Sequence, residues 1–352
     1  MKIITSTKYI KKTIFLSLAL TSTIISAQDT DKETKPKLSI SGTVDAYYRT
    51  NLSAPNDENA IIPGSSFANL NGFSLGMANI IASYDGKKTG FVADLVFGPR
   101  GEDAVFNSPL YTSIGGSSQI INQLYAYWNI TDDIKITLGN FNTFLGYEVI
   151  SPIANFNYST SYLFSYGPFS HTGLKIDIVL SDDFSLMLTV MNPTDLTEFN
   201  PSSKYAFGAQ LGYSNQYLNF LYDAGGFEID YTGGFDLTED FFLGINVAYF
   251  DNDGNGFAGA VLYPQYITSD NFTLGLRGEF FAQNGNFDAA LGTGVIDSSI
   301  FTATLTGSYT IENLTIKPEI RLDSASDNAF INADLAPSKN LSSFLLAAIY
   351  SF

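Results

Sequence analysis

The sequence contains no cysteine and only one histidine, His171. Without cysteine the chain cannot form disulfide bonds, thiolate zinc sites or a lipid-modified cysteine at a cleavage point. A single imidazole also excludes a multi-histidine metal cluster and a multi-histidine proton relay. We therefore predict that the chain has no metal site and no cofactor.

The chain is also poor in basic residues and lacks a long apolar run in its body. Lysine and arginine number 18 against 35 acidic residues, which gives a net charge of −17. So acidic a chain is not expected to bind nucleic acid, because it cannot release counterions from phosphates. Although 45% of the residues are hydrophobic, no run after residue 25 approaches the ~20 apolar residues of a membrane-spanning helix.

The N-terminus has the layout of a secretory signal. Its first twelve residues carry four lysines, residues 13–25 are apolar, and Ala27 precedes a polar run. This pattern predicts a signal peptide over 1–27 and a periplasmic linker over 28–37. An uncleaved anchor is the alternative, but the apolar stretch is short for a membrane span. Cleavage would remove the four lysines and no acid, so the net charge would change from −17 to −21.

The C-terminus is a strand with one apolar face. Phe344, Leu346, Ala348, Tyr350 and Phe352 share one parity and end the chain. Chain termini of soluble proteins are usually polar and frayed. An apolar closing strand is instead typical of outer-membrane barrels, whose outer face contacts lipid.

The same alternation recurs along the chain, and the connections between segments alternate in length. Every second connection is short and rich in Asp, Asn, Ser and Gly, whereas many of the others are long. Short periplasmic turns and long extracellular loops alternate in this way in outer-membrane barrels. The predicted strands are 38–50, 72–84, 89–98, 119–130, 134–143, 171–180, 184–191, 205–214, 217–223, 227–236, 241–250, 257–267, 272–282, 300–311, 314–323 and 341–352.

We therefore predict an all-β fold, a transmembrane antiparallel up-and-down β-barrel of about 16 strands over 38–352. The even strand count places both termini on the periplasmic side. A soluble β-sandwich is the alternative, because its strands also alternate. It would not require the regular alternation of loop lengths or the terminal phenylalanine. Pro318 lies mid-strand on the lipid-facing parity and predicts a bulge or local break, because proline donates no ladder hydrogen bond.

Charged residues in these strands prefer the parity opposite to the apolar residues. A Lys or Arg that faced hydrocarbon at mid-depth would cost ~2–4 kcal/mol, so this preference indicates a watery interior. The alternative for any single residue is that it pairs across the wall and has no role in selectivity. The candidate pore-lining and constriction residues are Asp45, Arg49, Lys135, Glu148, Tyr158, Tyr162, Tyr166, Lys175, Asp177, Arg277, Glu279, Lys317, Glu319, Arg321 and Asp323.

The longest loop, 144–170, is rich in aromatic residues and carries one charge, Glu148. An exposed loop of this composition would present a large apolar surface to water. We predict that it folds inward and narrows the barrel, which at about 16 strands has room for it. The alternative is a lid over the mouth of the barrel.

One resemblance is specific. The region 139–175 contains a strand, a Gly-Tyr-Glu turn and the run NYSTSYLFSYGPFSHTG. It resembles the corresponding region of the OmpL-like β-barrel porins, as do the segment 318–323 and the final strand. The resemblance implies an outer-membrane pore for small solutes and supplies no catalytic residues.

Two motifs that suggest other chemistry are weak. His171 follows Ser170, but neighbours on a strand point to opposite faces, and no G-x-S-x-G elbow is present. We therefore predict no enzymatic activity. The DNDGNG run at 251–256 matches the start of a calcium loop but has Leu262 at the twelfth position instead of Glu. We interpret it as a tight hairpin turn, with weak divalent binding left open.

The leading interpretation is a porin of the bacterial outer membrane that allows passive diffusion of small hydrophilic solutes and ions. An acidic lumen and acidic loops would favour cations. The alternatives are a substrate-specific channel, in which tyrosine rings contact planar solutes, and a non-conducting structural or adhesive surface barrel. The predicted partners are outer-membrane lipid, the permeating solutes or ions, and barrel-assembly machinery that would engage the strand ending at Phe352. A homo-oligomer is left open.

Overall fold

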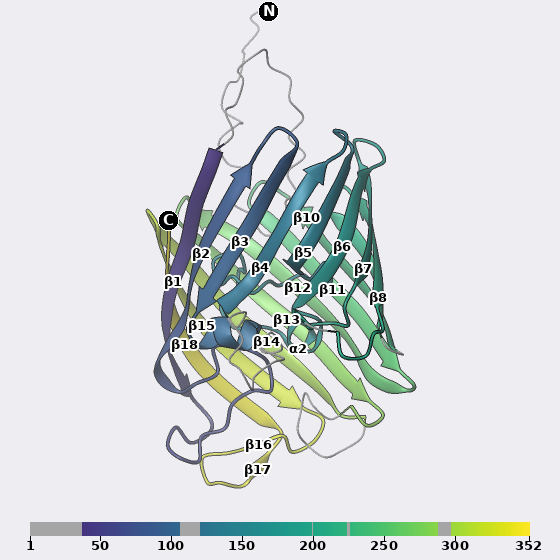
Figure 1. Cartoon of the computed structure of the whole chain (residues 1–352). Helices are drawn as coiled ribbons and strands as arrows, with labels where there is room; N and C mark the ends of the chain where they lie inside the picture. Colours follow the sequence, from purple (N-terminus) through teal and green to yellow (C-terminus); the bar gives the residue numbers. More distant parts are fainter. Residues whose placement is uncertain (1–36, 106–119, 199, 224–225, 288–296) are drawn as a thin grey trace, which may run out of the picture. The chain divides into compact units, whose positions relative to one another are not determined.

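Sixteen antiparallel strands close into a single barrel in the computed structural model, which describes residues 37–105, 120–198, 200–223, 226–287 and 297–352 (Figure 1). The predicted signal peptide and residues 28–36 of the predicted linker lie outside the described residues. The elements are β1 Lys37–Asn51, β2 Gly72–Asp85, β3 Thr89–Phe97, α1 Pro99–Ala104, β4 Ile121–Asn129, β5 Ile134–Asn142, α2 Tyr162–Tyr166, β6 Ser170–Val179, β7 Phe184–Met191, β8 Ala206–Tyr213, β9 Gln216–Asp223, β10 Gly226–Asp236, β11 Phe241–Asn252, β12 Asn255–Ser269, β13 Phe272–Asn284, β14 Ser299–Ile311, β15 Leu314–Ala325, β16 Phe330–Ile331, β17 Pro337–Ser338 and β18 Asn340–Ser351.

The predicted strands are confirmed. Each coincides with one barrel strand to within two residues at either end. The sequence did not predict the short helices α1 and α2 or the small β16–β17 hairpin, which all lie in long connections between barrel strands.

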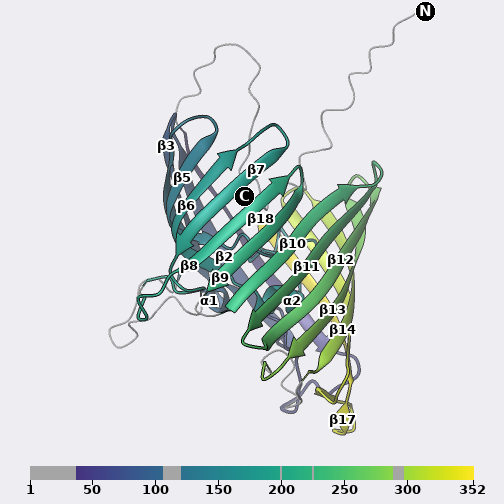
Figure 2. The same cartoon turned by 90° about the vertical axis from the view of Figure 1, so that its right-hand side faces the viewer.

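Each strand pairs with its sequence neighbour, and β18 pairs with β1 to close the barrel. Closure continues to the last residue, because Phe352 and Gly42 exchange backbone hydrogen bonds of 3.0 and 3.1 Å. The short turns lie at one end of the barrel and the long connections at the other, as Figure 2 shows from the side. This arrangement is the one expected of periplasmic turns and extracellular loops.

The two faces of the wall differ in exposure. Apolar side chains of one parity stand exposed on the outside; among them are Phe73 (91%), Leu75 (69%) and Leu138 (64%). This continuous apolar exterior suits contact with hydrocarbon. The opposite parity carries the polar and charged residues, many of them buried inside the barrel. No helix in the described ranges is long and apolar enough to cross a membrane.

Of the predicted bulge or local break at Pro318, the structure shows the local break and no bulge. The register of β14 with β15 is the same on both sides of the proline, from Thr306↔Glu319 to Tyr309↔Ile316, and only the pairs between them are interrupted. Gly307 lies beside the proline ring; a Cβ there would be in ordinary contact with that ring at 3.5 Å and would press on the Phe272 ring at 3.0 Å. The register shifts that the structure does contain occur between β1 and β2, between β3 and β4, and between β12 and β13.

Candidate functional site

The connection between β5 and β6, residues 143–169, packs against the inner parity of the wall; we call it the β5–β6 segment. Its Tyr162 and Leu163 share an apolar cluster with Val261 and Phe281, which project from the inner faces of β12 and β13. Tyr147 stacks on Tyr263 with ring centroids 4.4 Å apart. The aromatic side chains of the segment are thus buried against the barrel wall, and Tyr158 and Tyr162 are 0% exposed.

Carboxylates on the wall bind backbone N–H groups of the segment. Glu279 on β13 accepts from Tyr162 at 3.0 Å and from Leu163 at 2.8 Å. These amides belong to the first turn of α2, where backbone donors have no partner within the helix. Glu319 on β15 accepts from the backbone N–H groups of Tyr158 and Ser159.

Cations on the wall bind backbone carbonyl groups of the same segment. Lys317 donates to the carbonyl oxygens of Pro152 at 3.1 Å and Asn155 at 2.5 Å. Arg321 donates to the carbonyl oxygen of Thr160 at 3.0 Å and pairs with Asp323 at 2.8 Å. Side chains of the wall therefore bind both the N–H groups and the C=O groups of the segment's main chain.

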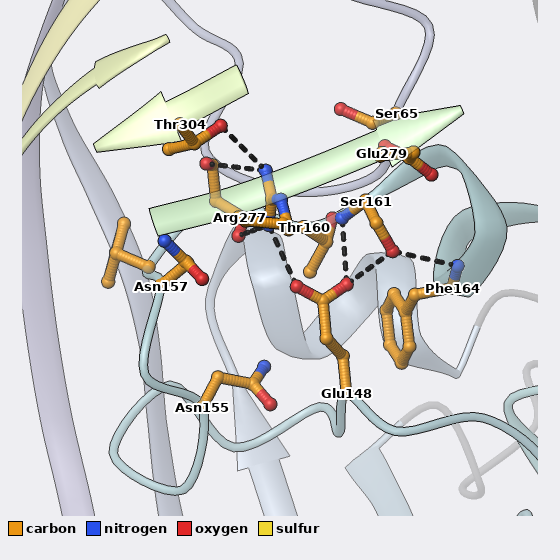
Figure 3. Close-up of polar contacts among 12 residues, drawn as sticks. Ser65, Glu148, Asn155, Asn157, Thr160, Ser161, Phe164, Arg277, Glu279 and Thr304 are labelled. Atoms are coloured by element: carbon orange, nitrogen blue, oxygen red, sulfur yellow. Dashed lines mark hydrogen bonds and ion pairs between the residues drawn. The ribbon is translucent and has the colours of Figure 1, made fainter. Parts of the chain in front are cut away.

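One ion pair joins the segment to the wall directly. Arg277 on β13 lies 2.7 Å from Glu148, with side chains 0% and 3% exposed (Figure 3). Glu148 also accepts from the backbone N–H of Ser161 at 2.7 Å and from its hydroxyl at 2.6 Å. Removing one partner of such a buried pair would leave an uncompensated charge and costs about 3–5 kcal/mol.

Neighbouring elements add to this network. Arg100 in α1 donates to the carbonyl oxygens of Ile150 at 2.8 Å and Tyr158 at 3.0 Å. The Tyr158 hydroxyl donates to Asp45 on β1. Asp230 on β10 accepts from the backbone N–H of Gly146 at 3.0 Å. The segment is therefore fixed from several sides of the wall.

Most of the candidate residues lie in or beside this network, where they are buried. The segment binds Asp45, Arg277, Glu279, Lys317, Glu319 and Arg321 directly, whereas Arg49 donates to Asn71. The candidates with exposures of 0–9% are Asp45, Arg49, Glu148, Tyr158, Tyr162, Arg277, Glu279, Lys317, Glu319, Arg321 and Asp323. Tyr166 is half-buried, and its hydroxyl donates to Gly64 at 2.8 Å.

The other three candidates lie apart, on β5 and β6. Asp177 lies 3.7 Å from Lys135 and 3.5 Å from Lys175, and the three side chains are 23–30% exposed. Tyr125 and Tyr127 on β4 and Tyr217 on β9 are also half-buried on the inner parity. This part of the wall is less covered than the part that binds the segment.

Sequence reasoning missed Arg100 and the role of Asp230. Asp230 accepts a hydrogen bond of 2.7 Å from Asn219 and another from Asn246, which face it from β9 and β11. Asn219 and Asn246 lie on the inner parity of their strands, and these two polar residues were the sequence signal that could have indicated the role of Asp230. Arg100 carried no such signal, because it lies in a long connection.

His171 is fully buried beside the segment. Its Nε2 lies 3.0 Å from the Thr143 hydroxyl, and its ring centroid lies 5.2 Å from that of Phe144. Residues 251–256 form the tight β11–β12 hairpin that we expected, with Asp251 paired to Gly256. Within the described ranges, no three His, Asp or Glu side chains are grouped so that they could hold a metal ion.

Comparisons with solved structures show a shared fold. The outer-membrane channel DcaP of Acinetobacter baumannii matches with a TM-score of 0.60 and 12% identity, over 92% of this chain and 99% of that one. An anion-selective porin from Comamonas acidovorans matches at 0.58 and 10%, over 90% and 100%. A loop-deletion mutant of OmpT from Vibrio cholerae matches at 0.50 and 12%, over 90% and 99%.

A search of curated protein sequences finds no match. The family model described as "Putative beta-barrel porin-2, OmpL-like" matches residues 37–352, which is the whole barrel. The closed sixteen-strand barrel, its apolar exterior and this match agree on one assignment. The chain belongs to the OmpL-like family of outer-membrane β-barrel porins.

Proposed function

We propose that the chain is a pore through which small hydrophilic solutes and ions cross the outer membrane by passive diffusion. The observation that carries this proposal is the uneven covering of the inner wall. The β5–β6 segment is hydrogen-bonded to β1, β10, β13 and β15, and its first residues reach β6 and β8. Polar side chains such as Tyr125, Lys135, Lys175 and Tyr217 stay partly exposed. A barrel of this size leaves an aqueous channel when it is not filled.

We further propose that the β5–β6 segment sets the pore size as a fixed constriction. Hydrogen bonds to charged groups contribute about 1.5–3 kcal/mol each. The segment receives several of them, from Glu279, Glu319, Lys317 and Arg321. Because these bonds are distributed along its length, the segment is held against the wall and does not open as a lid.

The ion preference that we propose for the whole pore is a bias towards cations. The chain carries a net charge of −17, and exposed acidic residues such as Asp57, Asp133 and Asp183 lie in loops and turns at both ends. Clusters of like charge at a channel mouth raise the local concentration of counterions.

Single-channel recording in a planar bilayer, with a salt gradient, tests this function. The chain purified from outer membranes should give stable conductance steps and a cation-biased reversal potential. Deletion of residues 155–167 should raise the conductance, since it removes the middle of the constriction. Circular dichroism should show the same β content in both proteins. Silence from a correctly folded wild-type barrel would overturn the pore and favour a structural or adhesive barrel.

A substrate-specific channel is the second candidate, favoured by the half-buried Tyr125, Tyr127 and Tyr217 on the inner wall. Tyrosine rings offer an apolar face and a polar tip to planar solutes. Saturable flux in a liposome assay would distinguish it from simple diffusion. Assembly through the strand ending at Phe352, signal cleavage after Ala27 and a homo-oligomeric state remain parts of the proposal to be measured.

A further inference from the structure

The charges inside the barrel have a different balance from the chain as a whole. The mid-strand carboxylates Asp45, Asp94, Glu228, Asp230, Glu279, Glu319 and Asp323 are at most 9% exposed. Asp177 is the exception within the described strands, with a side chain that is 27% exposed. Carboxylates that are covered by protein are out of contact with a solute in the lumen.

Most basic side chains of the strands are buried in the same way, and only a few stay partly exposed. The arginines of the described strands, Arg49, Arg277 and Arg321, and Lys317 are at most 3% exposed. Lys37, Lys87, Lys88, Lys204 and Lys339 lie at strand ends, in turns or in loops. Within the part of the chain that the structure describes, this leaves Lys135, the second residue of β5, and Lys175, in the middle of β6, as the strand cations of the inner parity that stay partly exposed, with side chains 30% and 23% exposed.

The two lysines are diagonal neighbours on the inner wall. Lys135 is paired with Asp177, and Thr137 with Lys175, across β5 and β6. Diagonal positions of this kind are about 7–8 Å apart, and lysine side chains are long and flexible. One small anion can therefore contact both ammonium groups.

Asp177 can engage only part of the lysines' donors, because each ammonium group has three N–H donors. Its contacts of 3.7 and 3.5 Å exceed the ~2.7–2.9 Å of a charge-assisted hydrogen bond. The next register pair along the wall is Gly139 with Gly173, which have no side chains. Lys175 extends past them, so that its Nζ lies 5.2 Å from the centre of the Phe141 ring. The Lys175 ammonium thus lies beside an aromatic ring and next to two residues without side chains.

We propose that Lys135 and Lys175 form a binding site in the lumen for small anions that carry a carboxylate or phosphate group. The inference rests on the proposed pore only for its physiological meaning, because binding itself needs no conduction. The three side chains of this cluster sum to +1 inside a chain of −17, and the exposed Asp133 lies two residues before Lys135 at the turn. The site would slow anions at one point of the lumen and reduce the cation bias of the whole pore.

Inorganic phosphate is the probe. Calorimetry on the purified barrel measures its binding, and planar-bilayer recordings at constant ionic strength measure its effect on current. The variants are the double exchange Lys135→Gln with Lys175→Gln, the exchange Asp177→Asn, and Lys204→Gln as a control. Lys204 is an exposed loop lysine, so its exchange removes a charge without touching the inner wall.

We expect phosphate to bind the wild type and the Lys204 variant equally and to reduce their currents. The double variant should bind at least ten-fold more weakly, because two charge-assisted contacts are lost. Its permeability ratio for potassium over chloride should rise about two- to five-fold, the effect of removing two nearby charges in screened water. Asp177→Asn should bind more tightly than the wild type, since the competing carboxylate is gone.

Equal phosphate binding by the wild type and the double variant would overturn the site, even in a conducting barrel. Binding that depends on both lysines in a barrel that never conducts would overturn the pore and leave the site in place. Matching circular dichroism spectra and detergent-resistant electrophoretic mobility establish that each variant is folded before these measurements are compared.

Discussion

Two parts of the same wall present charged side chains to the inside of the barrel in opposite ways. On β13 and β15, Arg277, Glu279 and Glu319 are buried and bind the main chain of the β5–β6 segment. On β5 and β6, Lys135, Lys175 and Asp177 stay partly exposed and contact one another loosely. Both groups lie on the inner parity of their strands. Only coverage by the segment separates a charge that fixes structure from a charge that meets solutes.

The largest effect is expected from breaking the buried pair. Arg277→Ala leaves the Glu148 carboxylate uncompensated and should destabilise the packed segment by about 3–5 kcal/mol. Single-channel recordings should then show higher conductance and more current noise. Combining Glu148→Gln with Arg277→Met removes both charges and should restore much of the wild-type behaviour. Unchanged conductance and noise in Arg277→Ala would show that the pair does not hold the constriction.

A smaller effect is expected from Glu279→Gln. The side chain keeps its shape, but its single carbonyl oxygen can accept from only one of the Tyr162 and Leu163 amides, and the other amide then faces an NH2 donor. Hydrogen exchange of these two amides should quicken by about ten-fold, which corresponds to ~1.4 kcal/mol. The exposed turn variant Asp133→Asn is the matched control and should leave their exchange rates unchanged. Equal rates in both variants would contradict the capping role of Glu279.

The open part of the wall should be much more tolerant of charge removal. Lys175→Gln affects a loose, partly exposed ion pair, and such pairs contribute about 0–1 kcal/mol. Urea unfolding in lipid should therefore shift by less than ~1 kcal/mol for Lys175→Gln but clearly more for Arg277→Gln. A similar loss in the two variants would remove the distinction between the two parts of the wall.

A separate effect, which depends on pH, concerns Asp195 in the connection between β7 and β8. Burial raises the pKa of its carboxyl from 3.8 to about 6; its hydrogen bonds from the Ser170 and Phe169 amides oppose this, and Asp223 adds to it. Between these pH values the folded chain holds a proton that the unfolded chain has lost. Stability should therefore fall as pH rises from ~4 to ~6, by no more than about 3 kcal/mol. In Asp195→Asn, the free energy of unfolding should no longer show this decrease between pH ~4 and ~6.

The strands could be predicted because a two-residue period and turn residues are local properties. The apolar parity of Leu314, Ile316, Ile320 and Leu322, for example, fixes the direction of every side chain on β15. The covering of the inner wall could not be predicted in the same way. Glu148 and Arg277 are 129 residues apart, and nothing in either neighbourhood specifies the other. Parity indicates the side of the wall that a residue faces, but not whether another segment lies over it.

The wall holds much of the β5–β6 segment through its peptide groups. Glu279, Glu319, Lys317 and Arg321 all bind N–H or C=O groups, which nearly every amino acid possesses. Side chains of the segment that do not pack on the wall are therefore largely free to be exchanged without loss of its anchorage. Substitutions at these positions of the β5–β6 segment could therefore alter the size or charge of the proposed pore while the attachment of the segment to the barrel wall is kept.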